Sequence, residues 1–367
     1  MRSGRAPKDD AMPIRRRLEY DSRPMARYFK SDNTAPAAPE ILEAIAAANH
    51  GYARGYGDDE WSARLEERFS TVFEKPVRVF PVATGTAANT LALATLVPPY
   101  GAILTHEEGH IVRDECGAPE FMTGGARLIL MQGAGAKVTP PAIENAIAAN
   151  PTSVHTVQPR ALSITQATEL GTVYTPAEVQ RLSTLAHARG LIVHMDGARF
   201  ANAVASLGCT PADITWRAGV DVLSFGATKN GALTAEAVVF FDPDRVADFE
   251  FRRKRAGHLL SKMRFVSAQL LAYLDDNLWL RLASRSNALA KRVGEAAGAA
   301  LMHPVDANEV FVRIGERGAA MLRERGFEFY DWGAVGSGEA RLVVSWDQPE
   351  EDVAALCAAL IDLQRKG

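Results

Sequence analysis

The sequence predicts an α/β protein with a mostly parallel sheet, helices on both of its faces, and a smaller α+β unit after it. Strand-type and helix-type segments alternate from residue 77 to about residue 245, and this alternation is typical of a parallel sheet. The chain has 367 residues, whereas a single hydrophobic core stops growing near roughly 250 to 300 residues. We therefore expect a second, smaller core.

The elements before and within the alternating block follow from their apolar patterns. Apolar residues at helical spacing predict helices over 36–50 and 61–73, joined by the loop GYARGYGDDE. Short apolar runs predict strands at 77–82, 102–105, 127–131, 160–166, 191–196, 221–228 and 236–241. Helices are predicted between them at 85–97, 139–150, 175–190 and 212–219.

The rest of the chain predicts the smaller unit. A long helical connection covers 251–300, and it is followed by strands at 309–314, 327–332 and 340–346 and helices at 318–326 and 351–366. We expect a large domain over 31–275 and a small domain over 276–367, the latter joined by the N-terminal segment. Residues 1–30 carry nine Lys or Arg against four acids without the apolar core of a secretory signal. They predict a mobile or loosely docked extension, with an organellar transit peptide as the alternative.

Composition limits the partners and the compartment. Hydrophobic residues make up 47% and charged residues 23%, as in ordinary soluble proteins. A net charge of −3 gives no field that would recruit nucleic acid or a membrane surface, and no apolar run reaches the roughly 18 residues of a membrane helix. Cys116, Cys209 and Cys357 lack the spacing of a zinc site or disulfide framework, so we expect no metal and a reducing, cytoplasmic setting.

Three polar features follow predicted strands, at the edge where parallel sheets bind ligands. Gly85 and Thr86 open a helix, whose free N–H groups suit a phosphate, although a plain helix start is the simpler interpretation. Asp196 ends a buried strand, where a carboxylate needs a cation or protonated nitrogen; a pair with Arg199 or a helix cap is the alternative.

Lys229 follows the next predicted strand and sits among small residues. A lone lysine in a turn is usually a surface residue, but a partly desolvated lysine forms a Schiff base with a carbonyl. A phosphate site, an acid and a lysine together favour a ligand with a phosphate, a basic ring nitrogen and an aldehyde. Pyridoxal 5′-phosphate has all three.

Six motifs together resemble the low-specificity L-threonine aldolases, of the β-eliminating lyase branch. They are SDN (31–33), GYGDD (55–59), TGTAAN (84–89), HIVRDECGAPEF (110–121), VHMDGARFANA (193–203) and FGATKNGA (225–232). The resemblance implies the aspartate-aminotransferase-like fold with a seven-stranded, mostly parallel sheet. Two departures stand out, TKN where many members have SKG, and TQATELGT (165–172) where many have an ENTH turn.

The resemblance also implies a role for each site residue. Lys229 would hold the cofactor as a Schiff base, Asp196 would keep the pyridine nitrogen protonated, and Gly85 and Thr86 would bind the phosphate. His110 would stack on the ring, Arg199 would lie near the ring oxygen and the substrate carboxylate, and Arg341 and Ser31 would complete the carboxylate site. Without the resemblance, the simpler interpretations are that His110 caps the preceding strand, that Arg341 is a surface arginine and that Ser31 is a helix cap.

The base for the substrate hydroxyl has two candidates. Imidazole suits this role because its unperturbed pKa is about 6.5. We favour His155, which matches a family histidine near the hydroxyl, with a purely positional role as the alternative. His110, acting directly or through water, is the second candidate.

The resemblance further implies a homotetramer, a dimer of dimers with active sites at a subunit interface. Tyr56 would contribute across that interface, and Lys254 and Arg264 would bind the phosphate, although a solvated helix face explains most charges of their basic run. The reaction implied is cleavage of L-threonine or L-allo-threonine, and of analogues such as phenylserine, to glycine and an aldehyde. The alternatives are a β-eliminating lyase or aminotransferase on the same scaffold, and a non-catalytic pyridoxal-phosphate-binding protein.

Overall fold

The main sheet has seven strands and is mostly parallel, as predicted. The structure, a computed structural model, describes residues 26–246 and 248–366. The strands are β2 (Arg78–Val82), β3 (Gly101–His106), β4 (Arg127–Met131), β5 (Gln158–Thr165), β6 (Ile192–Gly197), β7 (Val222–Gly226) and β8 (Glu236–Phe240). Their order is β2-β8-β7-β6-β5-β3-β4, and β8 alone among them runs antiparallel to its neighbours.

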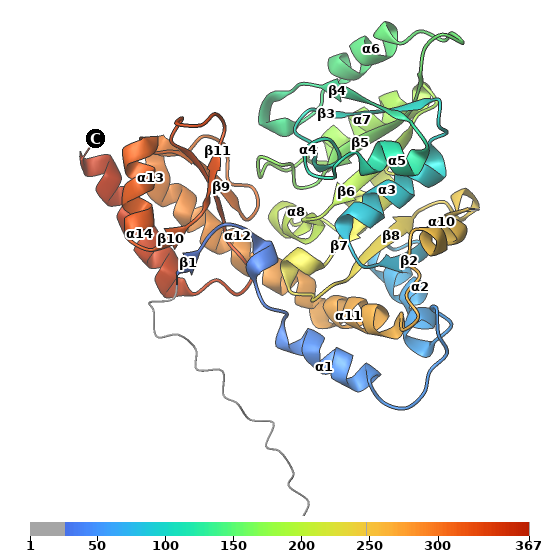
Figure 1. Ribbon diagram of the computed structural model, residues 1–367, viewed down its shortest axis with the longest axis horizontal. Coiled ribbons are helices and arrows are strands. Elements are labelled where there is room, and N and C mark those ends of the chain that lie inside the picture. Colours follow the sequence, from blue (N-terminus) through green and yellow to red (C-terminus); the bar gives the residue numbers. More distant parts are fainter. Residues whose placement is uncertain (1–25, 247, 367) are drawn as a thin grey trace, which may run out of the picture.

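Helices cover both faces of this sheet (Figure 1). They are α1 (Pro39–Ala48), α2 (Glu60–Val72), α3 (Gly85–Leu96), α4 (His110–Arg113), α5 (Ala118–Thr123), α6 (Pro140–Ala149), α7 (Pro176–Ala188), α8 (Phe200–Leu207), α9 (Pro211–Ile214), α10 (Phe249–Arg255) and α11 (Arg264–Leu274). Successive strand residues point to opposite faces. Val222 packs on the side of α3 and α10, whereas Leu223 packs on the side of α2, α8 and α11. Both faces are buried, so these strands read as continuous apolar runs.

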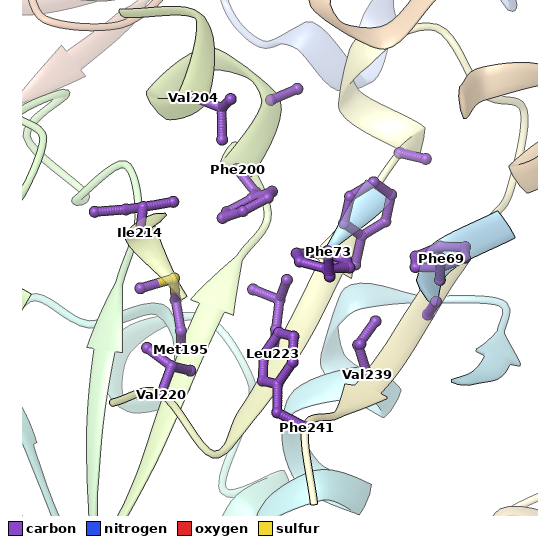
Figure 2. Close-up of a cluster of buried hydrophobic side chains, with 14 of the residues drawn as sticks. Phe69, Phe73, Met195, Phe200, Val204, Ile214, Val220, Leu223, Val239 and Phe241 are labelled. Carbon is purple, nitrogen blue, oxygen red and sulfur yellow. The ribbon is translucent and has the colours of Figure 1, made fainter. Parts of the chain in front are cut away.

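Aromatic side chains form the centre of the larger core. Figure 2 shows Phe69 of α2 and Phe73, which follows α2, beside Phe200 of α8 and Phe241, which follows β8. The ring centroids of Phe73 and Phe241 are 5.2 Å apart at an interplanar angle of 73°. Such edge-to-face pairs add roughly 0.5–1.5 kcal/mol each beyond the area they bury. This aromatic core therefore holds helices in place on one face of the sheet, below the ends of its strands.

The smaller body contains a three-stranded antiparallel sheet, of order β11-β12-β9. Its elements are β9 (Glu309–Arg313), α13 (Gly315–Glu324), β10 (Phe327–Glu328), β11 (Tyr330–Trp332), β12 (Glu339–Val343) and α14 (Glu350–Lys366). Figure 1 shows it at one end of the molecule, with α12 (Leu278–Ala297) running between the two bodies. Along α12, residues up to Ala283 pack in the larger core and residues from Leu289 onward pack in the smaller one. We propose that the domains divide within α12, a little after residue 276.

The N-terminal segment joins the smaller body. Strand β1 (Arg27–Tyr28) pairs in parallel with β10, and Phe29 is fully buried in the smaller core. Residues 26–30 are thus docked by backbone pairing and apolar burial, although we had assigned them to the extension. The rest of the extension, residues 1–25, lies outside the described residues.

Two predicted elements are divided in the structure. The helical connection expected over 251–300 consists of three α-helices, and Gly257, Asp276 and Asn277 between them have left-handed φ values of 80°, 47° and 53°. Such values cannot continue a right-handed helix. The strand expected over 327–332 is two short strands that pair in different sheets. Among the described residues, no helix is long and apolar enough to cross a membrane.

Candidate active site

A cavity of about 370 Å³ opens where β6 and β7 end and α3 begins. Its wall includes Thr84, Gly85, Thr86, His110, Asp196 and Lys229. The volume falls within the range of small-molecule sites. A larger groove of about 920 Å³ lies between α3, α5 and α10, but its wall is mostly apolar and lacks these groups. The chemistry predicted from the sequence is therefore concentrated in the smaller cavity.

The start of α3 offers backbone donors to this cavity. Thr84 caps the helix, since its Oγ1 accepts a hydrogen bond from the Ala87 N–H at 3.2 Å. The N–H groups of Gly85 and Thr86 belong to the first turn, which has no intrahelical acceptors. No atom lies within 4 Å of a Cβ built on Gly85. A side chain there would enter the cavity, so glycine keeps the helix start open to an anion.

Asp196 ends β6 and is 3% exposed. Its Oδ2 accepts a hydrogen bond from Asn89 Nδ2 at 2.8 Å, and its Oδ1 accepts one from the Ala198 N–H at 3.0 Å. The pair with Arg199, our simpler interpretation, does not form, because Arg199 binds Asp32. A buried carboxylate with only neutral donors suits a protonated ring nitrogen.

His110 is oriented by two residues that the sequence interpretation missed. Its Nδ1 lies 2.9 Å from Glu115 Oε1, which also accepts from Asn89 Nδ2 at 2.9 Å. The hydrogen bond to Glu115 raises the pKa of His110, and burial opposes this only in part. Burial raises the pKa of Glu115. Gly85 and Asn89 are four residues apart and therefore lie on one face of α3. This spacing was the signal in the sequence that could have identified Asn89 as a site residue.

These same groups resemble a cation site at first sight. Ligand-type atoms of His110, Glu115 and Asp196 lie within 4.8 Å of one another. The amide of Asn89 donates to both carboxylates, and so hydrogen bonds already account for their approach. We assign the cluster to the organic ligand site.

Lys229 lies in a short 3-10 helix, η4 (Thr228–Asn230), that follows β7. The side chains of its two neighbours, Thr228 and Asn230, hold the backbone of this turn in place by hydrogen bonds. Asn230 Nδ2 donates to Tyr273 Oη at 2.7 Å and to the Trp279 carbonyl at 2.9 Å, and Thr228 Oγ1 accepts from the Ala235 N–H at 3.1 Å. The hydrogen bonds of Asn230 are available to TKN but not to the commoner SKG pattern, since glycine has no side chain, whereas serine could replace the Thr228 hydroxyl.

Arg199 joins the N-terminal segment to the site. Its Nε and Nη2 donate to the two carboxylate oxygens of Asp32 at 2.8 and 3.0 Å, and its Nη1 lies 3.3 Å from Glu309 Oε2. Burial alone would raise the pKa of Asp32, but Arg199 and Lys229 outweigh it and lower that pKa. Asp32 and Glu309 were not predicted as site residues. The expected contact of Arg199 with ring oxygen and substrate stays a prediction.

The predicted carboxylate site lies at the junction of the two bodies. Arg341 Nε donates to Glu309 Oε1 at 3.0 Å, and its side chain is 20% exposed. Ser31 caps a 3-10 helix, η1 (Asp32–Thr34), through its Oγ, which accepts from the Asn33 N–H at 3.2 Å. The helix-cap interpretation of Ser31 is therefore correct, and its contact with substrate stays a prediction.

His155 does not line the cavity of its own chain, so any role as the base would be at the site of a neighbouring subunit and stays a prediction. It is exposed in the turn before β5. Residues before a parallel strand lie at the amino edge of the sheet, whereas the cavity is at the carboxyl edge. The eight residues of β5 separate the two edges by about 26 Å, since a strand rises about 3.3 Å per residue.

Tyr56, Lys254 and Arg264 lie outside the cavity wall of their own chain. Lys254 Nζ is 4.3 Å from the centroid of the Tyr56 ring, and Tyr56 is 54% exposed. Arg264 Nη1 donates to the Gly51 carbonyl at 3.2 Å. Their contribution to a neighbouring subunit stays a prediction.

Two further acids near the site were missed. Burial raises the pKa of Glu169 to about 7, with Asp196 and Glu309 adding to the effect. Burial also raises the pKa of Glu236 to about 7, although hydrogen bonds from Thr228 and Ala227 oppose it. Glutamates are common in sequences, and only burial distinguishes these two.

The donor set fits pyridoxal 5′-phosphate. The open helix start at Gly85 suits its phosphate, the buried Asp196 suits its ring nitrogen, and Lys229 suits its aldehyde. All three line one cavity of suitable volume. The buried Asn89 Oδ1 and Glu115 Oε2 also lack a hydrogen-bond partner among the described residues.

Comparison with known proteins gives the family. The β-eliminating lyase family matches residues 28–317. A low-specificity L-threonine aldolase of Pseudomonas aeruginosa is 46% identical over 332 residues, which cover 89% of this chain and 95% of the relative. The solved structure of Leishmania major threonine aldolase has a TM-score of 0.86 at 29% identity and covers 93% of this chain and 99% of its own. An aspartate aminotransferase from Rhodobacter sphaeroides shares the fold, with a TM-score of 0.69 at 15% identity over 94% of each chain. The chain belongs to the β-eliminating lyase family, and within it to the pyridoxal-phosphate-dependent low-specificity L-threonine aldolases.

Proposed function

We propose that this chain cleaves L-threonine and L-allo-threonine to glycine and acetaldehyde, and related substrates such as phenylserine to glycine and the matching aldehyde. The observation that carries the proposal is the cavity that brings Lys229, Asp196 and the start of α3 together. The identity to a threonine aldolase over most of both chains supports this activity over others of the same fold.

The residues present define where the cofactor would be held. Gly85 and Thr86 would bind the phosphate, Asp196 would keep the ring nitrogen protonated, and Lys229 would hold the aldehyde carbon. His110, fixed by Glu115, would lie against the ring. When bound, pyridoxal phosphate withdraws the electron pair of the bond that breaks.

Substrate orientation decides which bond breaks. Arg341 and Ser31 would hold the substrate carboxylate, and this contact sets the torsion that places the Cα–Cβ bond perpendicular to the ring. Arg199 is held in place by Asp32 and Glu309. Its fixed guanidinium would present one orientation to the ligand and thereby support the same torsion.

We also propose a homotetramer whose active sites lie at a subunit interface, in the cytoplasm. The apolar groove between α3, α5 and α10 includes Phe121, which is 81% exposed, and such a patch favours contact with another subunit. Tyr56 and Lys254 pair outside their own cavity, as expected of groups that reach a neighbour. The described cysteines are free, as a reducing compartment requires.

The test combines a spectrum with a product assay. Wild type should show a visible Schiff-base band that borohydride removes, and Lys229→Ala should lack this band and turnover. Lys291→Ala, a change of an exposed lysine on α12, should keep both. Release of acetaldehyde and glycine from L-threonine supports the proposal. Release of ammonia and a keto acid instead would overturn it.

A further inference from the structure

The loop after β5 leaves the sheet beside the catalytic carboxylate. The Gln166 N–H donates to the Asp196 carbonyl at 2.8 Å. This contact places residues 166–173 at the carboxyl edge of the sheet, where the cavity lies. The segment includes the departure from the commoner family pattern.

This loop is fixed on both sides. Thr168 and Thr172 both donate to the Gly135 carbonyl, at 3.0 and 2.6 Å. On the other side, a Cβ built on Gly171 would lie 3.0 Å from the Glu309 carbonyl oxygen of the smaller body. The loop therefore fills the junction between the two bodies, and Glu169 lies between its two fixed points.

The carboxylate of Glu169 lies beside the site, next to the backbone of His110, and is not itself part of the cavity wall. Its Oε1 accepts a hydrogen bond from the His110 N–H at 3.2 Å. Among the described residues, no donor binds its Oε2. Glu169 interacts electrostatically with five charged groups, which belong to Asp196, Glu309, His110, Lys229 and Arg199. Burial and the two acids raise the pKa of Glu169 to about 7, which suits a proton acceptor that works near neutral pH.

The other candidates for a base are less suitable. The His155 of the same chain lies at the opposite edge of the sheet and does not reach this cavity. His110 is bound through Nδ1 to Glu115, which favours its protonated form and so weakens it as a proton acceptor. Both carboxylate oxygens of Asp196 already accept hydrogen bonds, from Asn89 and Ala198. Glu236 lines the cavity beside Gly85 and Lys229, at the end proposed for the cofactor.

We infer that Glu169 is the catalytic base that takes the proton of the substrate β-hydroxyl, an inference that rests on the proposed aldolase function. In the step, the O–H bond breaks and its proton goes to a Glu169 carboxylate oxygen. The oxygen lone pair forms the C=O of the leaving aldehyde as the Cα–Cβ bond breaks. The electron pair of that bond remains on Cα, which later takes up a proton to give glycine.

The experiment compares two reactions of the holoenzyme, since glycine has no β-hydroxyl. Exchange of the glycine α-proton in deuterated water needs the cofactor, Lys229 and the carboxylate site, but no hydroxyl base. Glu169→Gln should lower kcat for L-threonine cleavage by about 100-fold or more, as for loss of a general base, and should leave glycine exchange at the wild-type rate. Glu107→Gln, at the same sheet edge, is the matched control and should keep both.

The pH profile gives a second readout. In wild type, kcat/KM for L-threonine should fall below about pH 7, where Glu169 is protonated. Glu169→Gln should lose this limb, whereas Glu169→Asp should keep the limb at reduced rate. The Asp variant also serves if the Gln variant does not fold.

Three results overturn the inference. Cleavage unaffected by Glu169→Gln would show that the carboxylate takes no proton. An equal loss of cleavage and glycine exchange would reduce Glu169 to a structural role. Wild type that exchanges glycine but releases no aldehyde would refute the proposed function itself, and the inference with it.

Discussion

Glu236 provides a test of how burial sets the charge of this site. It is the first residue of β8, opposite Gly226 of β7, and is 7% exposed. Its Oε2 accepts a hydrogen bond from the Ala227 N–H at 3.1 Å. Glu236→Gln keeps an acceptor of the same shape at this position but removes the ionisable group.

The magnitude follows from the pKa. Burial raises the pKa of Glu236 from 4.5 to about 7, and at about 1.36 kcal/mol per pKa unit the effect on unfolding free energy is at most about 3 kcal/mol. The folded state holds the proton more tightly than the unfolded state does. The stabilisation from this proton is therefore fully present below pH 4.5 and is lost as pH rises through about 7. The Gln variant has no such loss.

The assay is urea unfolding of the cofactor-free protein at pH 5 and pH 8.5. We expect Glu236→Gln to be more stable than wild type at pH 8.5, by up to about 3 kcal/mol, and within about 1 kcal/mol of it at pH 5. Glu67→Gln, an exposed change on α2, should alter stability by less than about 0.5 kcal/mol at either pH. A variant that is less stable than wild type at pH 8.5 would refute the reasoning.

Two other predictions concern binding and assembly. Arg341→Lys should raise KM for L-threonine by roughly 10-fold or more while changing kcat less, because the lysine ammonium cannot form a bidentate pair with a carboxylate. Steady-state kinetics measure both constants. An unchanged KM would remove Arg341 from the carboxylate site. If Lys254 serves the site of a neighbour, the Lys254→Ala and Lys229→Ala variants should each be inactive alone. When the two variants are unfolded and refolded together, activity should return, because a mixed assembly contains one site with both lysines intact. Mixtures that stay inactive would place Lys254 outside that site.

Much of the fold could be predicted because its signals are local. Alternation of strands and helices predicted the parallel sheet, and seven strands are present at or near the expected ranges. The helix breaks at Gly257 and Asn277 were missed, because φ values there depend on how α10, α11 and α12 pack. The sequence predicted that the N-terminal segment joins the smaller domain, but not that Phe29 is buried in its core, since the partners of Phe29 come from the far end of the chain.

The sequence by itself determined which reactive residues meet at the carboxyl edge of the sheet. Gly85, Asp196 and Lys229 all lie at strand ends, and strands of a parallel sheet bring those ends to one edge, so their meeting follows from the pattern. The tertiary structure decided the rest. It placed His155 away from the cavity of its own chain, paired Arg199 with Asp32, joined His110 and Asn89 through Glu115, and placed Glu169 at the junction. These outcomes depend on distances between residues far apart in the chain and on desolvation, and a linear pattern contains neither.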